Sequence, residues 1–153
     1  MEKLPQKFIY PVILVMLFDF AFTFLGQSKG YWLNYSKVNE GSPLGFSLLS
    51  SHPLYFLLFC LFYLLLVIIL MKKLPAFLAS VFGLSLFLGH VWGSSSWLPR
   101  LFYKLGLYNP NNIFSHWYFS VGYFIFISLI SVLIISKKDK LKKSHESKNI
   151  KKN

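Results

Sequence analysis

The chain has 153 residues, of which 55% are hydrophobic and 20% aromatic, and its formal charge is +11. The apolar content leaves little length for a soluble domain, so we expect one compact membrane domain. The positive charge lies mainly outside the apolar runs, so the membrane surface accounts for it better than nucleic acid does. The single cysteine, Cys60, excludes an intrachain disulfide.

Four apolar runs follow one another along the chain, at 8–26, 53–71, 74–91 and 117–135. A helix rises about 1.5 Å per residue, so about 20 residues cross a hydrocarbon core of about 30 Å. Asp19 is the only formally charged residue inside any of these runs. The sequence therefore predicts an all-α integral membrane protein, with a bundle of four transmembrane helices within residues 1–136.

The first run contains the least ordinary residue of the chain, Asp19. A carboxylate at that depth costs at least about 2.5 kcal/mol on insertion scales, so we expect it to face the bundle or a wet cavity. Thr23, Gly26 and Gln27 follow at helical spacing and share its face. This face suits a proton site, a cation site or a catalytic carboxylate. The plainer alternative is a protonated Asp19 that hydrogen-bonds to a neighbouring helix.

The loop after the first run contains Glu40, the only acidic residue of the two longer loops, and a segment, 44–49, that fits a short helix. His90 lies near the end of the third run. Asp19, Glu40 and His90 are therefore the candidates for acid–base chemistry.

Three histidines, together with carboxylates, also suit a zinc or other transition-metal site. There is no H-E-x-x-H motif, no histidine pair at i and i+4 and no cysteine set, so the spacing does not identify a metal. The candidate metal ligands are His52, His90 and His116.

The two halves of the chain resemble each other at an offset of about 63 residues. Phe-Leu-Gly closes both the first run and the third, and Ser-His precedes the second and the fourth. The pattern fits two tandem helical hairpins, and chance similarity between apolar segments is the alternative. Small residues spaced by four let helices approach closely. The candidate packing or binding glycines are Gly26, Gly30, Gly89 and Gly93.

Lysine and arginine are distributed unevenly between the two sides of such a bundle. Four spans place twelve of them with the two termini and the 72–73 connector, and four on the other side. We therefore expect both termini in the cytoplasm, with the protein in the plasma membrane. The tail, 137–153, is lysine-rich and polar, so we expect it to be disordered and to contact anionic lipids. The lysines near the membrane are Lys137, Lys138, Lys140, Lys142 and Lys143.

These features favour a small multi-pass protein whose outward-facing polar site binds, carries or helps assemble a component at the outer leaflet. Two alternatives stay open. One is a membrane-embedded enzyme, metal-dependent or not, that acts on a lipid or lipid-linked substrate. The other is a subunit of a proton-coupled transporter, which would work as a homo-oligomer or in a larger membrane complex. The sequence leaves the cofactor and the substrate open.

Overall fold

The structure, a computed structural model, describes residues 4–107 and 113–150, with side chains over 7–107 and 118–137. Most of the described residues are helical, and none of them lies in a strand. Four helices are long and apolar enough to cross a membrane, which confirms the predicted all-α, four-helix membrane fold. The elements are α1 (Leu4–Gly26), α2 (Lys29–Leu33), η1 (Tyr35–Lys37), α3 (Pro43–Ser51), α4 (Pro53–Lys73), α5 (Ala76–Lys104) and α6 (Ile113–Ile150).

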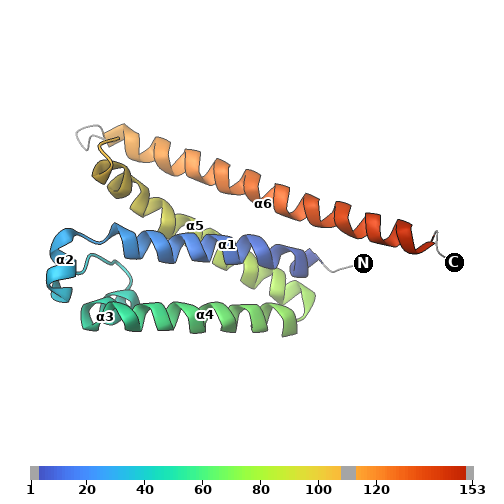
Figure 1. Ribbon diagram of the computed structural model, residues 1–153, viewed down its shortest axis with the longest axis horizontal. Coiled ribbons are helices and arrows are strands. Elements are labelled where there is room, and N and C mark those ends of the chain that lie inside the picture. Colours follow the sequence, from blue (N-terminus) through green and yellow to red (C-terminus); the bar gives the residue numbers. More distant parts are fainter. Residues whose placement is uncertain (1–3, 108–112, 151–153) are drawn as a thin grey trace.

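Two of the four long helices form the centre of the bundle, and the other two lie outside them (Figure 1). α1 and α5 run in the same direction and make the most extensive helix contact, and α4 and α6 flank them on opposite sides. α1 contributes to two apolar clusters, since Met16 packs with Val67 of α4, and Val15 packs with Ile127 of α6. Tandem hairpins would produce this arrangement, but the duplication itself stays a prediction.

The outward surfaces of the long helices are apolar. Large side chains such as Leu61 and Phe62 of α4, and Leu129 and Leu133 of α6, are exposed. In water, exposed apolar surface of this extent is costly. It is the surface expected of helices that face lipid.

The third long helix does not stop at residue 91, the predicted end of the third span, and where the membrane ends along it stays a prediction. α5 continues to Lys104, so its 29 residues reach about 44 Å. The serines after residue 91 lower the hydropathy but do not break the helix, because each hydroxyl donates to a carbonyl of the preceding turn. Ser94 bonds to the His90 carbonyl, Ser95 to that of Trp92 and Ser96 to that of Gly93.

The tail also differs from the expectation of disorder. The backbone of α6 continues as a helix to Ile150. Residues 137–150 contain no proline or glycine, and lysine, leucine and glutamate favour helix, so nothing stops the helix where the span ends. Lys137 is exposed. The side chains of Lys138, Lys140, Lys142 and Lys143, and all of residues 151–153, lie outside the described part of the chain, and their contact with lipid stays a prediction.

The segment between α1 and α4 folds back over one end of the bundle, which we call the loop end (residues 27–52 and the C-terminal part of α5). α3 contains the helix predicted at 44–49 and begins after Ser42, whose hydroxyl accepts a hydrogen bond from the Gly45 amide. The buried Tyr31 hydroxyl donates to the Leu49 carbonyl at 3.1 Å. Burial, and secondarily Tyr35, raises the pKa of Tyr31 above its ordinary value. This hydrogen bond ties α2 to α3.

Candidate functional site

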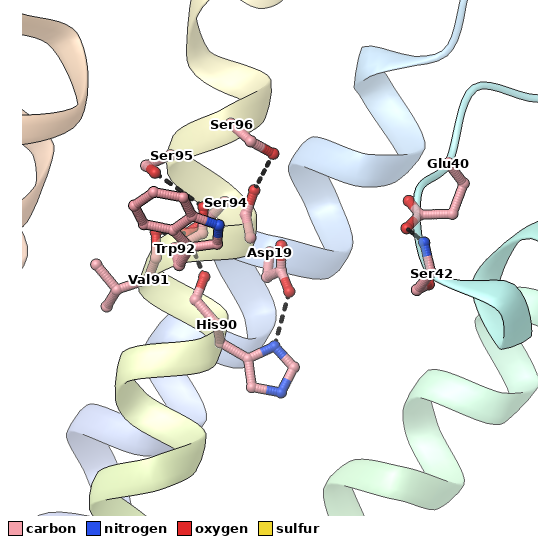
Figure 2. A network of polar contacts seen from close by, with 10 residues as sticks. Asp19, Glu40, Ser42, His90, Val91, Trp92, Ser94, Ser95 and Ser96 are labelled. Carbon is pink, nitrogen blue, oxygen red and sulfur yellow. Dashed lines mark hydrogen bonds and ion pairs between the residues drawn. The ribbon is translucent and has the colours of Figure 1, made fainter. Parts of the chain in front are cut away.

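The contact between Asp19 and His90 joins the two central helices. Nδ1 of His90 on α5 lies 2.7 Å from Oδ2 of Asp19 on α1 (Figure 2). The side chains are only 14% and 18% exposed for His90 and Asp19 respectively. A carboxylate at this distance accepts the Nδ1 proton, which leaves Nε2 as the free ring nitrogen.

Gly93 makes this contact sterically feasible. A Cβ atom there would lie 2.7 Å from Oδ1 of Asp19 and 2.9 Å from Oδ2. One turn farther along α5, the ring of Trp97 covers Gly26, where a Cβ would lie 2.2 Å from a ring carbon. Gly30 and Gly89 meet nothing tighter than ordinary van der Waals contact. Of the four candidate glycines, the structure thus places one from each half at the close α1–α5 contact.

Aromatic rings hold the imidazole of His90 in place. Phe20 of α1 meets it edge to face at 5.6 Å between centroids, and Tyr63 of α4 lies at 6.0 Å. The second ring nitrogen of His90 faces away from Asp19 (Figure 2). The ring orientation is therefore determined by one hydrogen bond and two packed rings.

Asp19 and His90 line a pocket of about 980 Å³ between α1, α4, α5 and the segment around Glu40. This volume is at the upper end of the range, about 300–1,000 Å³, usual for small-molecule sites. The three candidates for acid–base chemistry therefore share one pocket. Its polar lining includes Asp19, Thr23, Glu40, His90, Ser96 and Arg100, and its apolar lining includes Phe20, Phe56, Phe59, Leu86, Trp92 and Trp97.

Of the two carboxylate oxygens of Glu40, only one has a hydrogen-bond partner among the described residues. Its Oε1 accepts a hydrogen bond from the Ser42 amide at 2.8 Å, which links it to the start of α3. Its Oε2 is buried and has no hydrogen-bond partner among the described residues. A buried carboxylate oxygen without a donor is unfavourable, so this atom is a position where a ligand donor would be stabilised.

Gln27 holds the Glu40 segment against α1 and is itself 1% exposed. Its Oε1 accepts from the Asn39 amide at 3.0 Å, and its Nε2 donates to the Asn39 carbonyl at 3.2 Å and to the Thr23 carbonyl at 3.0 Å. These bonds use both amide hydrogens and the amide oxygen. Gln27 is therefore a positioning residue, and the buried Thr23 beside it lines the pocket.

Sequence reasoning missed two cations on α5. Arg100 lines the pocket with its guanidinium carbon 5.0 Å from the centre of the Trp97 ring. Lys104 donates through Nζ to the carbonyls of Leu25, Gly26 and Gln27, and so caps the C-terminus of α1. The third apolar run ends before both residues, so hydropathy alone predicts a loop there. Their spacing from His90 and Gly93 is helical, and this signal becomes visible once α5 is extended.

The three candidate metal-ligating histidines are not brought together. His52 caps α4, because its Nδ1 accepts from the Leu54 amide, and its ring packs on Tyr35 and Tyr55. It does not line the pocket that contains His90. The side chain of His116 lies outside the described residues. Within the described part of the chain, no three His, Cys, Asp or Glu side chains converge on one point.

No protein family, curated protein sequence or solved structure matches this chain. The fold and the pocket alone define its class, a four-helix membrane bundle with a carboxylate–imidazole pair in a pocket between its helices.

Proposed function

We propose that the protein binds an amphipathic molecule in the pocket between α1, α4 and α5. The observation that carries the proposal is the convergence of Asp19, Glu40 and His90 on one cavity of about 980 Å³ within a membrane bundle. The lining of this cavity contains acidic and imidazole groups, and it also contains aromatic side chains. A ligand with a polar head and an apolar chain matches both parts of this lining.

The proposal also specifies the side of the membrane on which the pocket opens. The bias of lysine and arginine favours cytoplasmic termini, and both ends of the described chain lie at the end of the bundle opposite the loop end (Figure 1). The pocket would then open at the outer leaflet of the plasma membrane, where the protein binds, carries or helps assemble its ligand.

Cysteine labelling tests the orientation. In a chain lacking Cys60, Lys37→Cys should react with a membrane-impermeant maleimide in intact cells. Lys72→Cys, which places a thiol on the exposed last turn of α4, should react only after the cells are opened. The reverse labelling pattern would overturn the outward orientation.

Filling the pocket tests ligand binding. Gly89 lines the pocket and has open space at its Cβ, so Gly89→Leu adds bulk there without a backbone clash. Gly122→Leu is the matched control, because Gly122 also has open space and does not line the pocket. Both variants are reconstituted with a phospholipid extract and examined by native mass spectrometry. We expect the Gly89 variant alone to lose bound phospholipid, and equal retention by both would contradict the proposal.

A second candidate is catalysis on a lipid or lipid-linked substrate, which the Asp19–His90 contact favours. A carboxylate that fixes one imidazole nitrogen leaves the other free to take a proton from water or a hydroxyl. Glu40, in the same pocket, would be the second acid–base group. Lipid analysis of proteoliposomes tests this candidate. A product that appears with the wild type and not with His90→Ala would support catalysis, and identical lipid profiles would exclude it for the lipids supplied.

A further inference from the structure

We propose that the pocket recognises a zwitterionic headgroup, a phosphate ester of a primary amine, with the ammonium at Glu40 and the phosphate at Arg100. The inference rests on the proposed binding function and specifies its ligand. It predicts a preference for phosphatidylethanolamine over other phospholipids of equal chain length.

The contacts along the bundle place the two charges at a similar level of the pocket. Gly93 contacts Asp19, Trp97 contacts Gly26, and Lys104 reaches the end of α1. Arg100 therefore lies at the level of the α1 C-terminus. Asn39, which pairs with Gln27, brings Glu40 to the same level. Glu40 and Arg100 thus line the pocket near its loop end, and the Asp19–His90 pair lies deeper in the bundle.

Glu40 is suited to a primary ammonium group. Its buried Oε2 lacks a donor, and it forms no ion pair with any described residue. A primary ammonium carries three N–H donors, whereas a quaternary ammonium carries none. The unpartnered oxygen therefore discriminates between the two amine types by hydrogen bonding and not by charge alone.

Arg100 is suited to the phosphate. Its guanidinium is stacked on Trp97 and has no carboxylate partner among the described residues. Stacking on the ring limits the conformations of the side chain while leaving its N–H edge free. That planar edge binds phosphate oxygens in a bidentate manner. Arg100 is also the only lysine or arginine that lines the pocket within the described part of the chain.

Between the charges and the bundle centre lies the Asp19–His90 pair. In a bound phospholipid, the glycerol backbone follows the phosphate, so its ester oxygens would lie toward His90 Nε2. The acyl chains would continue along the apolar lining toward lipid. The order of groups along the pocket thus matches the order of groups along one phospholipid molecule.

The test uses the purified full-length protein, stripped of lipid and titrated with phosphatidylethanolamine, phosphatidylcholine and phosphatidylglycerol of identical chains in native mass spectrometry. We expect phosphatidylethanolamine to bind about tenfold more tightly than the other two. Glu40→Gln keeps an acceptor for the Ser42 amide and removes the charge, so it should abolish this preference. Arg100→Gln should weaken all three lipids alike. Lys37→Gln, which removes an exposed cation of the same end, is the control and should change nothing.

The outcomes separate this inference from the binding function. Equal binding of the three lipids, with binding still abolished by Gly89→Leu, would overturn the headgroup assignment and leave the binding function intact. Binding that Gly89→Leu does not affect would overturn both. Water-soluble glycerophosphoethanolamine is a further probe, and competition by it at the affinity of the lipid would overturn the lipid as the source of the headgroup.

Discussion

Asp19 occupies the space that a side chain at Gly93 would take, since a Cβ there would lie 2.7 Å from Oδ1 of the carboxylate. Gly93→Ala must therefore displace Asp19 or separate α1 from α5, and we expect it to cost about 1–3 kcal/mol. Gly89→Ala is the matched control on the same helix, because its Cβ meets open space and alanine favours helix by up to about 1 kcal/mol. Thermal unfolding in detergent measures both. Equal stability of the two variants would contradict the close contact.

Asp19→Asn separates charge from hydrogen bonding. The asparagine oxygen still accepts the Nδ1 proton of His90, so we expect the fold and the unfolding temperature to be nearly unchanged. The negative charge beside His90 is lost, so we expect weaker lipid binding or, if the protein is an enzyme, lower turnover. A variant with normal binding, turnover and fold would assign Asp19 to helix packing alone.

Gln27→Ala should loosen the wall of the pocket that contains Glu40. The change removes both bonds to the Asn39 backbone, at a cost of about 1 kcal/mol. Hydrogen exchange of the Asn39 amide should accelerate. Asn34→Ala is the control, because its side chain bonds only within the exposed η1 turn. Unchanged protection of Asn39 would show that Gln27 does not hold the segment.

Lys104→Met keeps the aliphatic length of the side chain and removes its donors. The carbonyls of Leu25, Gly26 and Gln27 then lose their shared cation, and we expect a loss of about 1 kcal/mol. The control is Lys29→Met, on an exposed residue of the same end. Chemical denaturation in detergent compares the two variants, and the capping role requires the larger loss at Lys104.

Tyr31→Phe should show a pH-dependent effect. Burial raises the pKa of Tyr31 above its ordinary value of 10.0, so the folded protein favours the neutral phenol. The corresponding stabilisation is complete below the unfolded pKa and is lost as the pH rises through the folded one. Tyr31→Phe also loses the bond to the Leu49 carbonyl, about 1 kcal/mol at neutral pH. Denaturation at pH 7 and above pH 10 should show that the wild type and Tyr31→Phe differ less in free energy of unfolding at the higher pH. A difference that is constant with pH would contradict this.

The length of the apolar runs was enough to predict the four spanning helices, because the thickness of the bilayer and the rise of a helix determine that signal. The end of α5 was not predictable from hydropathy, since Ser94, Ser95 and Ser96 are polar residues that bond within the helix.

The site was predicted only as separate residues. Asp19 and His90 were recognisable as polar groups in apolar surroundings, but their contact depends on how α1 and α5 cross, which no local pattern encodes. Arg100 was missed because the helix continues beyond the apolar run that predicts it. The position of Glu40 depends on Gln27, whose twelve-residue reach to Asn39 is a tertiary contact.

The separation of Asp19 from His90 has a consequence for biogenesis. His90 follows Asp19 by 71 residues, so at a synthesis rate of about 5–20 residues per second the carboxylate precedes its partner by about 4–14 s. During that interval α1 must enter the membrane with an unmatched acidic group, and its main packing partner, α5, does not yet exist. Insertion of α1 is therefore the step at which this chain would depend most on an insertase.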